Sequence, residues 1–419
     1  MSKHRNLKLN DLAAPGRSVI SGPFGSNIGQ RFFQNVGVPV IRGNNLTTDF
    51  RKFNDDGFVF LTEEKADELK ADAVRGDILF TAAGTIGQVG MIPQSSKYTR
   101  YVISNKQLRF RVNTQIADPD YVYYWLASPW IYKTIVDRNT GSTVPLINLG
   151  IIKSLPISLP ESIIEQKKIS RILSLIDEKI ILNNCINSKL ETMAKILYDY
   201  WFVQFDFPNA NGKPYKSSGG KLVYNPIVKR EIPIDWEVKN LSQIANITMG
   251  QSPVGESYNE NGNGTLFFQG STDFGWLFPT PRKYTTLPAR MAKKGDILLS
   301  VRAPVGDVNI ANANCCIGRG LAALNSKSGS DGFLFYVMKY FKQVFDRRNS
   351  EGTTFGSITK DDLHSLKVIY PQQKILKQYD NIVSEYNKII FLRSLESRDL
   401  IKLRDWLLPM LMNGQVTVR

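Results

Sequence analysis

The strongest constraint in this sequence is an internal duplication. Residues 75–92, RGDILFTAAGTIGQVGMI, align without gaps on residues 294–311, KGDILLSVRAPVGDVNIA, at an offset of 219. Residues 141–160, GSTVPLINLGIIKSLPISLP, align on residues 352–371, GTTFGSITKDDLHSLKVIYP, at an offset of 211. A weaker match pairs PVIRGNNL with LFFQGSTD. Ordered matches at nearly constant offset mark a repeated structural unit, so the 419 residues are predicted to fold as two related halves.

The matched blocks and the segments that follow them predict different secondary structure. The blocks are short Val-, Ile-, Leu- and Phe-rich runs bounded by Gly, Asn, Asp and Pro, which is typical of strands and tight turns. After Pro160 and Pro371 the pattern changes to a helical period. The predicted fold class is α/β (α+β), with two strand-rich modules joined by two long antiparallel coiled-coil helices in pseudo-two-fold symmetry. The predicted boundaries are module 1, 1–160; central helix, 161–205; connecting segment, 206–235; module 2, 236–371; and distal helix, 372–412.

Both predicted helices carry a heptad seam with a polar centre. A central helix over about 161–203 would run roughly 60 Å, which suits a spacer. Antiparallel packing would place Asn183 and Asn187 opposite Arg393 and Glu396 and so fix the register. Ordinary packing of each helix on its own module is the alternative. The predicted seam consists of Ile169, Leu173, Ile176, Ile180, Asn183, Asn187, Leu190, Ala194, Leu197 and Trp201, and of Tyr379, Ile382, Tyr386, Ile389, Arg393, Glu396, Leu400, Leu403, Leu407 and Met410.

Charge and cysteine content narrow the class of protein. The formal net charge is +15, and the excess lies in the two modules: 19 basic against 13 acidic residues in 1–160, and 15 against 11 in 236–371. Such an excess favours a polyanionic partner. No apolar run is long enough for a membrane span, and the N-terminal segment does not resemble a secretory signal. Three cysteines and two histidines suit a reducing cytoplasm and disfavour structural zinc or histidine-dependent catalysis.

Motifs for DNA-modifying chemistry are missing. The run Gly219-Gly220-Lys221-Leu222 lacks the spacing and the Ser or Thr of a phosphate-binding loop. Asn225-Pro226-Ile227 is not the motif of an adenine methyltransferase. Asp177-Glu178-Lys179 imitates a nuclease metal site, but a helical position makes a solvated face the better interpretation. No catalytic residue and no metal site is predicted.

Taken together, these blocks resemble the specificity subunits of type I restriction–modification enzymes over essentially the whole chain. The resemblance rests on the two GDIL blocks, on GSTVPLINL and GTTFGSITK with Pro160 and Pro371, and on IDEKIILNNCINSKLETMAKILYDYWF running into FDFPNANGKP. It implies a non-catalytic subunit with two target-recognition domains, each reading one half of a split DNA site. The helices would set the spacing between the half-sites and serve as a docking site.

The same resemblance implies partners and cofactors. Two methyltransferase (modification) subunits would bind the helical regions and methylate adenine at N6 from S-adenosylmethionine. Restriction subunits would add ATP- and magnesium-dependent translocation and cleavage. This chain would bind double-stranded DNA but no cofactor, in the cytoplasm of a bacterium or archaeon, at the nucleoid.

Base-reading residues do not transfer by resemblance, because recognition domains differ freely in sequence, so DNA contacts are proposed from chemistry. Cations suit phosphates, Arg suits guanine and Asn suits adenine. Exposed strand faces and ligand-free turns are the competing interpretations. The candidates in module 1 are Arg42, Asn44, Asn45, Lys97, Arg100, Tyr101, Lys106, Arg109, Arg138 and Asn139. Those in module 2 are Arg282, Lys283, Tyr284, Lys293, Lys294, Arg347, Arg348 and Asn349.

Two other functions remain open from the sequence. One is a nuclease or methyltransferase with an unrecognised motif, which activity of the isolated chain would reveal. The other is a coiled-coil scaffold that binds protein, which weak and salt-insensitive DNA binding would favour.

Overall fold

The computed structural model describes residues 4–350 and 357–418, without the side chains of residue 344 and residues 347–350. The chain divides into two compact units. Unit 1 comprises Met1–Leu182 and Glu396–Arg419, and unit 2 comprises Asn183–Leu395. Each long helix therefore contributes to both units, whereas the sequence suggested helices separate from the modules. The reason is that α5 (Ile163–Tyr198) and α9 (Gln373–Met412) each place apolar side chains in the core of unit 1 and in the core of unit 2.

Repeat 1, in unit 1, contains three sheets. The four-stranded sheets have the strand orders β2-β9-β6-β7 and β4-β3-β8-β5, and β1 pairs with β10. The strands are β1 (His4–Lys8), β2 (Val19–Ser21), β3 (Val38–Ile41), β4 (Val59–Leu61), β5 (Asp72–Ala73), β6 (Ile78–Thr81), β7 (Val89–Met91), β8 (Tyr101–Ile103), β9 (Gln107–Phe110) and β10 (Pro156–Pro160). The short helices are α1 (Glu63–Leu69), α2 (Pro119–Leu126), α3 (Pro129–Asp137) and α4 (Leu149–Lys153).

Repeat 2, in unit 2, reproduces that topology. Its sheets have the orders β14-β22-β19-β20 and β15-β17-β16-β21-β18, and β13 pairs with β23. The strands are β13 (Glu237–Asn240), β14 (Ala245–Met249), β15 (Tyr258–Asn259), β16 (Thr265–Phe268), β17 (Lys283–Thr285), β18 (Met291–Ala292), β19 (Ile297–Ser300), β20 (Val308–Ile310), β21 (Cys315–Ile317), β22 (Leu321–Ser326) and β23 (Lys367–Tyr370). The helices are α6 (Leu241–Ile244), α7 (Asp331–Ser350) and α8 (Lys360–Ser365). Even the parallel pair β3–β8 returns as β16–β21, so the duplication extends to the fold.

The recurring GDIL block closes the same turn in both repeats. Gly76 and Gly295 have φ of 87° and 95°, a conformation that favours glycine. The carboxylate of Asp77 accepts a hydrogen bond from the backbone N–H of Val74 (2.8 Å), and that of Asp296 accepts one from Lys293 (2.8 Å). The following Ile-Leu pair is buried in β6 and in β19. The block is thus repeated for a structural reason.

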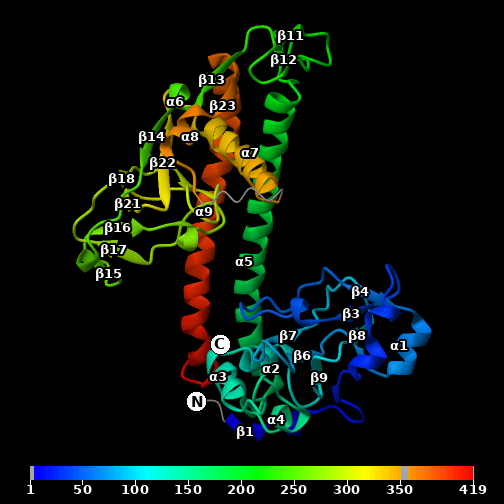
Figure 1. Ribbon diagram of the computed structural model, residues 1–419. Helices are drawn as coiled ribbons and strands as arrows, with labels where there is room; N and C mark the ends of the chain where they lie inside the picture. The colour runs from blue at the N-terminus through cyan, green and yellow to red at the C-terminus, as the bar shows by residue number, and fades with distance from the viewer. Residues whose placement is uncertain (1–3, 351–356, 419) are drawn as a thin grey trace. The chain divides into compact units, whose positions relative to one another are not determined.

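The connecting segment 206–235 is more ordered than its composition suggested. It contains an antiparallel hairpin of β11 (Leu222–Asn225) and β12 (Arg230–Pro233). Figure 1 shows this hairpin beyond the C-terminal end of α5. Its strands have four residues each, and the neighbouring residues Val223 and Tyr224 are both exposed. The alternation of buried and exposed side chains that would predict a strand is therefore missing.

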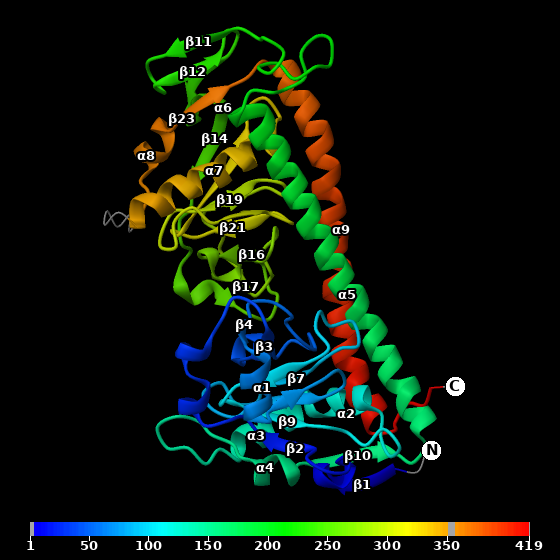
Figure 2. The ribbon, with the colours of Figure 1, turned by 90° about the vertical axis from the view of Figure 1, so that its right-hand side faces the viewer.

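The two long helices run antiparallel within each unit, side by side in both ribbon views (Figures 1 and 2). In unit 2, Arg393 Nη1 donates to Asn183 Oδ1 (3.0 Å), the contact that the seam predicted. Asn187, however, donates to Ser394 Oγ (3.2 Å), and Glu396 forms an ion pair with Lys179 (3.4 Å) in unit 1. Asn183 and Arg393 thus face each other as the seam predicted, whereas these contacts give Asn187 and Glu396 partners outside the predicted set.

The predicted seam of α9 is also out of register. Ile382, Ile389 and Leu403 are exposed, and the buried positions lie one residue later. The prediction chose apolar residues that are in fact exposed, because two of the buried positions, Ser397 and Arg404, are polar. On the buried face of α9 lie Leu376, Tyr379, Val383, Ile390, Ser397, Arg404, Leu408 and Leu411. On α5 the predicted positions Ile169, Leu173, Ile176, Ile180, Asn183, Asn187 and Ala194 are buried, and Leu190 and Leu197 are half-buried.

In both repeats a carboxylate binds the first turn of a helix, α2 in repeat 1 and α7 in repeat 2. The carboxylate belongs to the residue before the helix in repeat 1 and to the long helix α9 in repeat 2. In repeat 1 the carboxylate of Asp118 accepts from the backbone N–H of Tyr121 (3.1 Å) and from Ser170 Oγ on α5 (2.7 Å). In repeat 2 the carboxylate of Asp380, on α9, accepts from the backbone N–H of Phe333 (3.1 Å). Ser170 and Asp380 are each the eighth residue of their helix. Burial raises the pKa of both carboxyls.

Exchanging Asp118 and Ser170 tests this relationship. Asp118→Ser alone replaces the carboxylate at the start of α2 by a neutral hydroxyl, and Ser170→Asp alone places two carboxylates together, so both should destabilise the chain. The double variant recreates the arrangement of repeat 2 and should be more stable than the sum of the single effects predicts, by about 1–2 kcal/mol. Urea unfolding of the full chain measures this coupling, and additive effects would contradict it.

Candidate nucleic-acid interface

Five chain segments of repeat 1 meet where β2, β3, β6 and β8 end. Backbone hydrogen bonds join them in sequence: Gly22 N to Gln107 O (2.9 Å), Ser104 N to Ile41 O (2.9 Å), Ala82 N to Lys106 O (2.7 Å) and Ile147 N to Ala82 O (2.8 Å). We call the surface of residues 22–30, 42–57, 82–88, 104–106 and 139–147 the loop face of repeat 1. It brings together the two blocks that the duplication first identified, GDIL with its hairpin and GSTVPLINL.

Repeat 2 has the same four hydrogen bonds. They run from Gly250 N to Leu321 O (2.9 Å), Gly318 N to Phe268 O (2.8 Å), Val301 N to Gly320 O (2.9 Å) and Ile358 N to Val301 O (2.8 Å). The loop face of repeat 2 thus comprises residues 250–257, 269–282, 301–307 and 318–320 with residues 357 and 358. Matched bonds in loops of different sequence show that this surface, and not only the strands beneath it, is duplicated.

Several predicted DNA-contacting residues of repeat 1 instead stabilise the module. Arg100 donates to the carboxylates of Asp72 (2.7 Å), Asp67 (2.6 Å) and Glu63 (3.0 Å), and the bonds to Asp72 and Asp67 raise the pKa of its guanidinium. Three carboxylates offset its charge, so it is a poor phosphate anchor.

Tyr101, Arg109 and Lys97 are likewise engaged. Tyr101 is buried and its hydroxyl donates to Asp55 (2.8 Å). Arg109 is buried, with one nitrogen donating to the backbone oxygen of Asp72 (2.7 Å). The prediction that these two side chains contact DNA is wrong, because the sequence pattern did not reveal their burial. Lys97 is exposed and forms an ion pair with Asp56.

Two of the predicted asparagines also form hydrogen bonds within the module. Asn45 is fully buried: its side-chain nitrogen donates to the backbone oxygens of residues 54 and 56 (2.8 and 3.0 Å), so its proposed role in reading adenine is wrong. Asn139 Oδ1 accepts from the backbone N–H groups of Gly141 (2.9 Å) and Leu146 (2.8 Å), which fits the turn-stabilising alternative.

Three further candidates reach the loop face or its border. Arg138 donates to Ser154 Oγ (3.0 Å), and Arg42 donates to the backbone oxygen of Gly57 (3.0 Å). Asn44 is exposed on the loop face and accepts a hydrogen bond through its backbone oxygen. DNA contact by these three residues stays a prediction.

The candidates of repeat 2 are scattered. Arg282 forms an ion pair with Asp273 (2.7 Å). Lys283 and Tyr284 are half-buried on β17. Lys293 and Lys294 precede β19, at the end opposite to the loop face, and Lys294 lies over the ring of Phe391 on α9 (5.8 Å). The side chains of Arg347, Arg348 and Asn349 lie outside the described residues.

The loop faces carry cations that the sequence analysis mostly missed. Lys106, Arg302 and Arg319 are exposed, and no hydrogen bond or ion pair engages their side chains among the described residues. Arg290 is also exposed, and its side chain likewise has no hydrogen bond or ion pair among the described residues. It borders the loop face, because its backbone oxygen accepts from the N–H of Ile317 (2.8 Å), directly before residues 318–320. Their common signal is a position in or beside a turn that follows a repeated strand.

Comparison with known proteins identifies the family. The sequence profile of the type I restriction modification DNA specificity domain matches residues 28–192 and 233–390, one match for each repeat. The chain belongs to this specificity family. A type I restriction enzyme specificity subunit of Methanocaldococcus jannaschii, MjaX, is 31% identical over 395 residues, covering 92% of this chain and 88% of its own length. The HindI specificity subunit of Haemophilus influenzae is 23% identical, covering 82% of this chain and 87% of its own length.

A solved structure supports the fold of this specificity-family chain. The S subunit of a type I restriction–modification system from M. genitalium is 16% identical, with a TM-score of 0.65, over 98% of this chain and 96% of that one. The predicted fold class is confirmed, with two strand-rich modules and two long helices in one chain.

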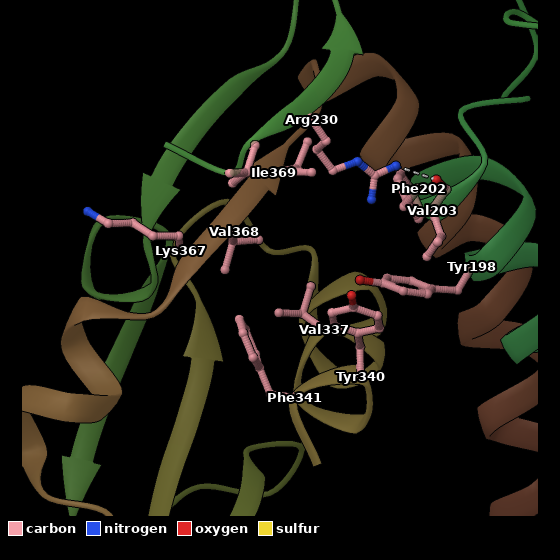
Figure 3. A pocket seen from close by; sticks show the side chains of 11 residues that line it. Tyr198, Phe202, Val203, Arg230, Val337, Tyr340, Phe341, Lys367, Val368 and Ile369 are labelled. Atoms are coloured by element: carbon pink, nitrogen blue, oxygen red, sulfur yellow. Dashed lines mark hydrogen bonds between the residues drawn. The ribbon is translucent and has the colours of Figure 1, made fainter. Parts of the chain in front are cut away.

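The pocket in Figure 3 lies in unit 2, between the end of α5, α7, β12 and β23. Its volume is about 250 Å³. Its polar groups are Arg230, which donates to the backbone oxygen of Val203 (2.8 Å), Lys367 and the hydroxyls of Tyr198 and Tyr340. Its lining includes no carboxylate, histidine or cysteine.

The described part of the specificity-family chain holds neither a candidate metal site nor a candidate membrane span. No group of three or more His, Cys, Asp and Glu side chains is arranged to hold a metal ion there. No helix in that part combines the length and hydropathy of a membrane span.

Proposed function

We propose that this chain is the non-catalytic DNA-recognition subunit of a type I restriction–modification complex, in which each loop face reads one half of a bipartite site. The observation that carries the proposal is the duplicated loop face, which is held by the same four backbone hydrogen bonds and carries or borders exposed cations that have no ion-pair partner in the described part of the chain. Loops on a rigid scaffold suit recognition, since their sequences can vary without loss of the core.

The charge of the chain supports DNA over a protein partner. Lys106, Arg290, Arg302 and Arg319 form no ion pair with any other residue that the structure describes, and the net charge is +15. Cations of this kind contact phosphates and position the protein, while neighbouring side chains read base edges.

The long helices suit two further roles. α5 has 36 residues and α9 has 40, so each is long enough to take part in both units, and their lengths would set the spacing between the half-sites. We assign the docking of two modification subunits to their exposed apolar side chains. These are Leu175, Ile181, Leu182, Met193 and Ile196 on α5, and Ile382, Ile389, Leu392, Ile401, Leu403 and Trp406 on α9.

The remaining components would reside on partner subunits. The modification subunits would bring S-adenosylmethionine, and restriction subunits would bring ATP and magnesium. The complex would act in the cytoplasm at the nucleoid, and its methyltransferase would extract the target adenine from the duplex.

Mapping of DNA methylation tests this function. The chain is co-expressed with its neighbouring methyltransferase, the complex is purified, and methylated adenines are located by sequencing. A split motif with a methylated adenine in each half is expected, and it should disappear when this chain is omitted. Methylation that is unchanged without the chain, or failure to form a complex, would contradict the proposal and favour a protein-binding scaffold.

A further inference from the structure

Each loop face carries a Pro-apolar-Gly tip after its first strand. In repeat 1 the tip is Pro23-Phe24-Gly25, after β2, and in repeat 2 it is Pro253-Val254-Gly255, after β14. Both glycines begin a short 3₁₀ helix, Gly25–Ile28 and Gly255–Ser257. The sequence comparison did not align these tips.

The apolar side chains of both tips face solvent. Phe24 is 84% exposed, the highest value among the large apolar side chains that the structure describes. Val254 is 63% exposed. Packing within the chain gives no reason for an apolar residue at either position. Exposed apolar groups on a binding surface commonly mark a contact with a partner.

The tip lies against the turn that carries Lys106 in repeat 1 and Arg319 in repeat 2. A Cβ atom on Gly22 would lie 1.8 Å from the backbone oxygen of Ser104, and one on Gly250 would lie 2.1 Å from that of Gly318. Only glycine allows these two loops to approach so closely, and it does so at both equivalent places.

Further contacts bring the tip close to the cation in each repeat. In repeat 1, a Cβ atom on Gly25 would lie 3.1 Å from Asn105 Nδ2, next to Lys106. In repeat 2, the backbone N–H of Arg319 donates to Ser252 Oγ (3.3 Å), two residues before Val254. Each tip thus places an exposed apolar side chain beside a turn that carries an exposed cation, Lys106 in repeat 1 and Arg319 in repeat 2, although the two cations are not at equivalent positions of the turn.

We propose that this pair is a repeated DNA-reading device, an inference that rests on the proposed function. Phe24 contacts a base edge in one half-site, and Val254 does so in the other. The chemistry that suits both side chains is the 5-methyl group of thymine in the major groove, which apolar side chains recognise. Lys106 and Arg319 contact the neighbouring phosphates and carry no sequence information.

The two parts of the device predict different defects in the complex with the methyltransferase. Phe24→Ala should reduce discrimination at one base pair of one half-site about tenfold and leave the other half unchanged, and Val254→Ala should show a smaller loss in the other half. Lys106→Ala and Arg319→Ala should weaken binding to specific and non-specific DNA alike and lower the slope of log K against log salt by about 1 each. Methylation of a library randomised in both half-sites measures the base discrimination. Binding titrations at several salt concentrations measure the affinity and its salt dependence.

Matched controls come from the same repeats. Val36 is 75% exposed and precedes β3, away from the loop face, so Val36→Ala should change nothing. Lys327 is exposed and follows β22 at the end opposite to the loop face, so Lys327→Ala is the control for the cations. A split motif that keeps its full discrimination in the Phe24 and Val254 variants would overturn this inference and leave the proposed function intact. Absence of a split motif with the unmodified chain would overturn the proposed function. A Phe24 variant that loses the methyltransferase but keeps the motif would make the tip a protein contact, which also overturns the inference.

Discussion

Replacing Trp406 by glutamate is expected to release the modification subunit while the chain stays folded. Trp406 lies on α9, 62% exposed, on the face that does not pack into the core. Exposed tryptophans that become buried in an interface commonly contribute 2 kcal/mol or more. An affinity about 30-fold weaker is therefore the least that Trp406→Glu should cause, measured by titrating the purified methyltransferase.

Two variants make this result specific. Trp406→Phe keeps an apolar ring and should retain most of the affinity. Leu287→Glu adds the same charge at a position that is also 62% exposed, in repeat 2, and should bind the modification subunit normally. Normal binding by Trp406→Glu would show that this face of α9 does not hold that subunit.

Replacing Arg404, two residues earlier on the same helix, by leucine is expected to destabilise the fold instead. Arg404 Nη1 donates to Asp177 Oδ1 on α5 (2.9 Å), and both side chains are buried. The hydroxyl of Tyr124 donates to the other oxygen of the same carboxylate (2.6 Å). Asp177, predicted on a solvated face, is thus a buried link between both long helices and repeat 1. Arg404→Leu leaves this charge without its cation, which should cost about 3–5 kcal/mol in the free energy of unfolding.

The loss should depend on pH in a defined direction. Burial raises the pKa of Asp177, and the bonds from Tyr124 and Arg404 oppose the rise. Without Arg404 the pKa in the folded state rises further above its ordinary value of 3.8, so the folded protein binds a proton more tightly than the unfolded chain. The deficit should therefore be full at neutral pH and shrink as the pH falls through the raised pKa.

Adding Asp177→Asn distinguishes this explanation from a simple loss of packing. The second change removes the buried charge and keeps an acceptor for Tyr124, so it should recover much of the stability and abolish the pH dependence. Urea unfolding at neutral pH and at about pH 5 provides the comparison. A deficit that is equal at both pH values would contradict the role of the charge.

The sequence predicted most of the architecture because the duplication was visible in short-range patterns. The GDIL block needs a glycine with positive φ and an aspartate that closes the turn, so its residues recur wherever the turn does. The heptad pattern located α5 and α9 but misplaced the seam of α9. Ser397 and Arg404 occupy buried positions there, while Ile382 and Leu403 are exposed, and hydrophobic periodicity assumes the reverse.

The candidate site was harder to predict because electrostatic neutralisation acts between distant residues. Arg100 bonds to carboxylates 28, 33 and 37 residues earlier, which no local pattern reveals. Arg319, in contrast, occurs alone in a glycine-rich turn and was not predicted as a DNA contact, although it is exposed on the loop face and has no ion-pair partner among the described residues. Clusters of basic residues in the sequence were thus a weaker guide than single cations in turns after repeated strands.

The exchange of the carboxylate between Asp118 and Asp380 bears on how such chains can evolve by recombination. A gene fusion that joined the first module to the second long helix would place Asp118 and Asp380 at one buried position, and the charges would repel each other. The reciprocal fusion would bring Ser330 and Ser170 together and leave the start of α7 without the carboxylate that Asp380 supplies. Each module is therefore compatible with the helix that follows it in the chain. Crossovers that keep Asp118 with α5, or Ser330 with α9, are expected to persist among descendants, and crossovers between a module and its helix are expected to be lost.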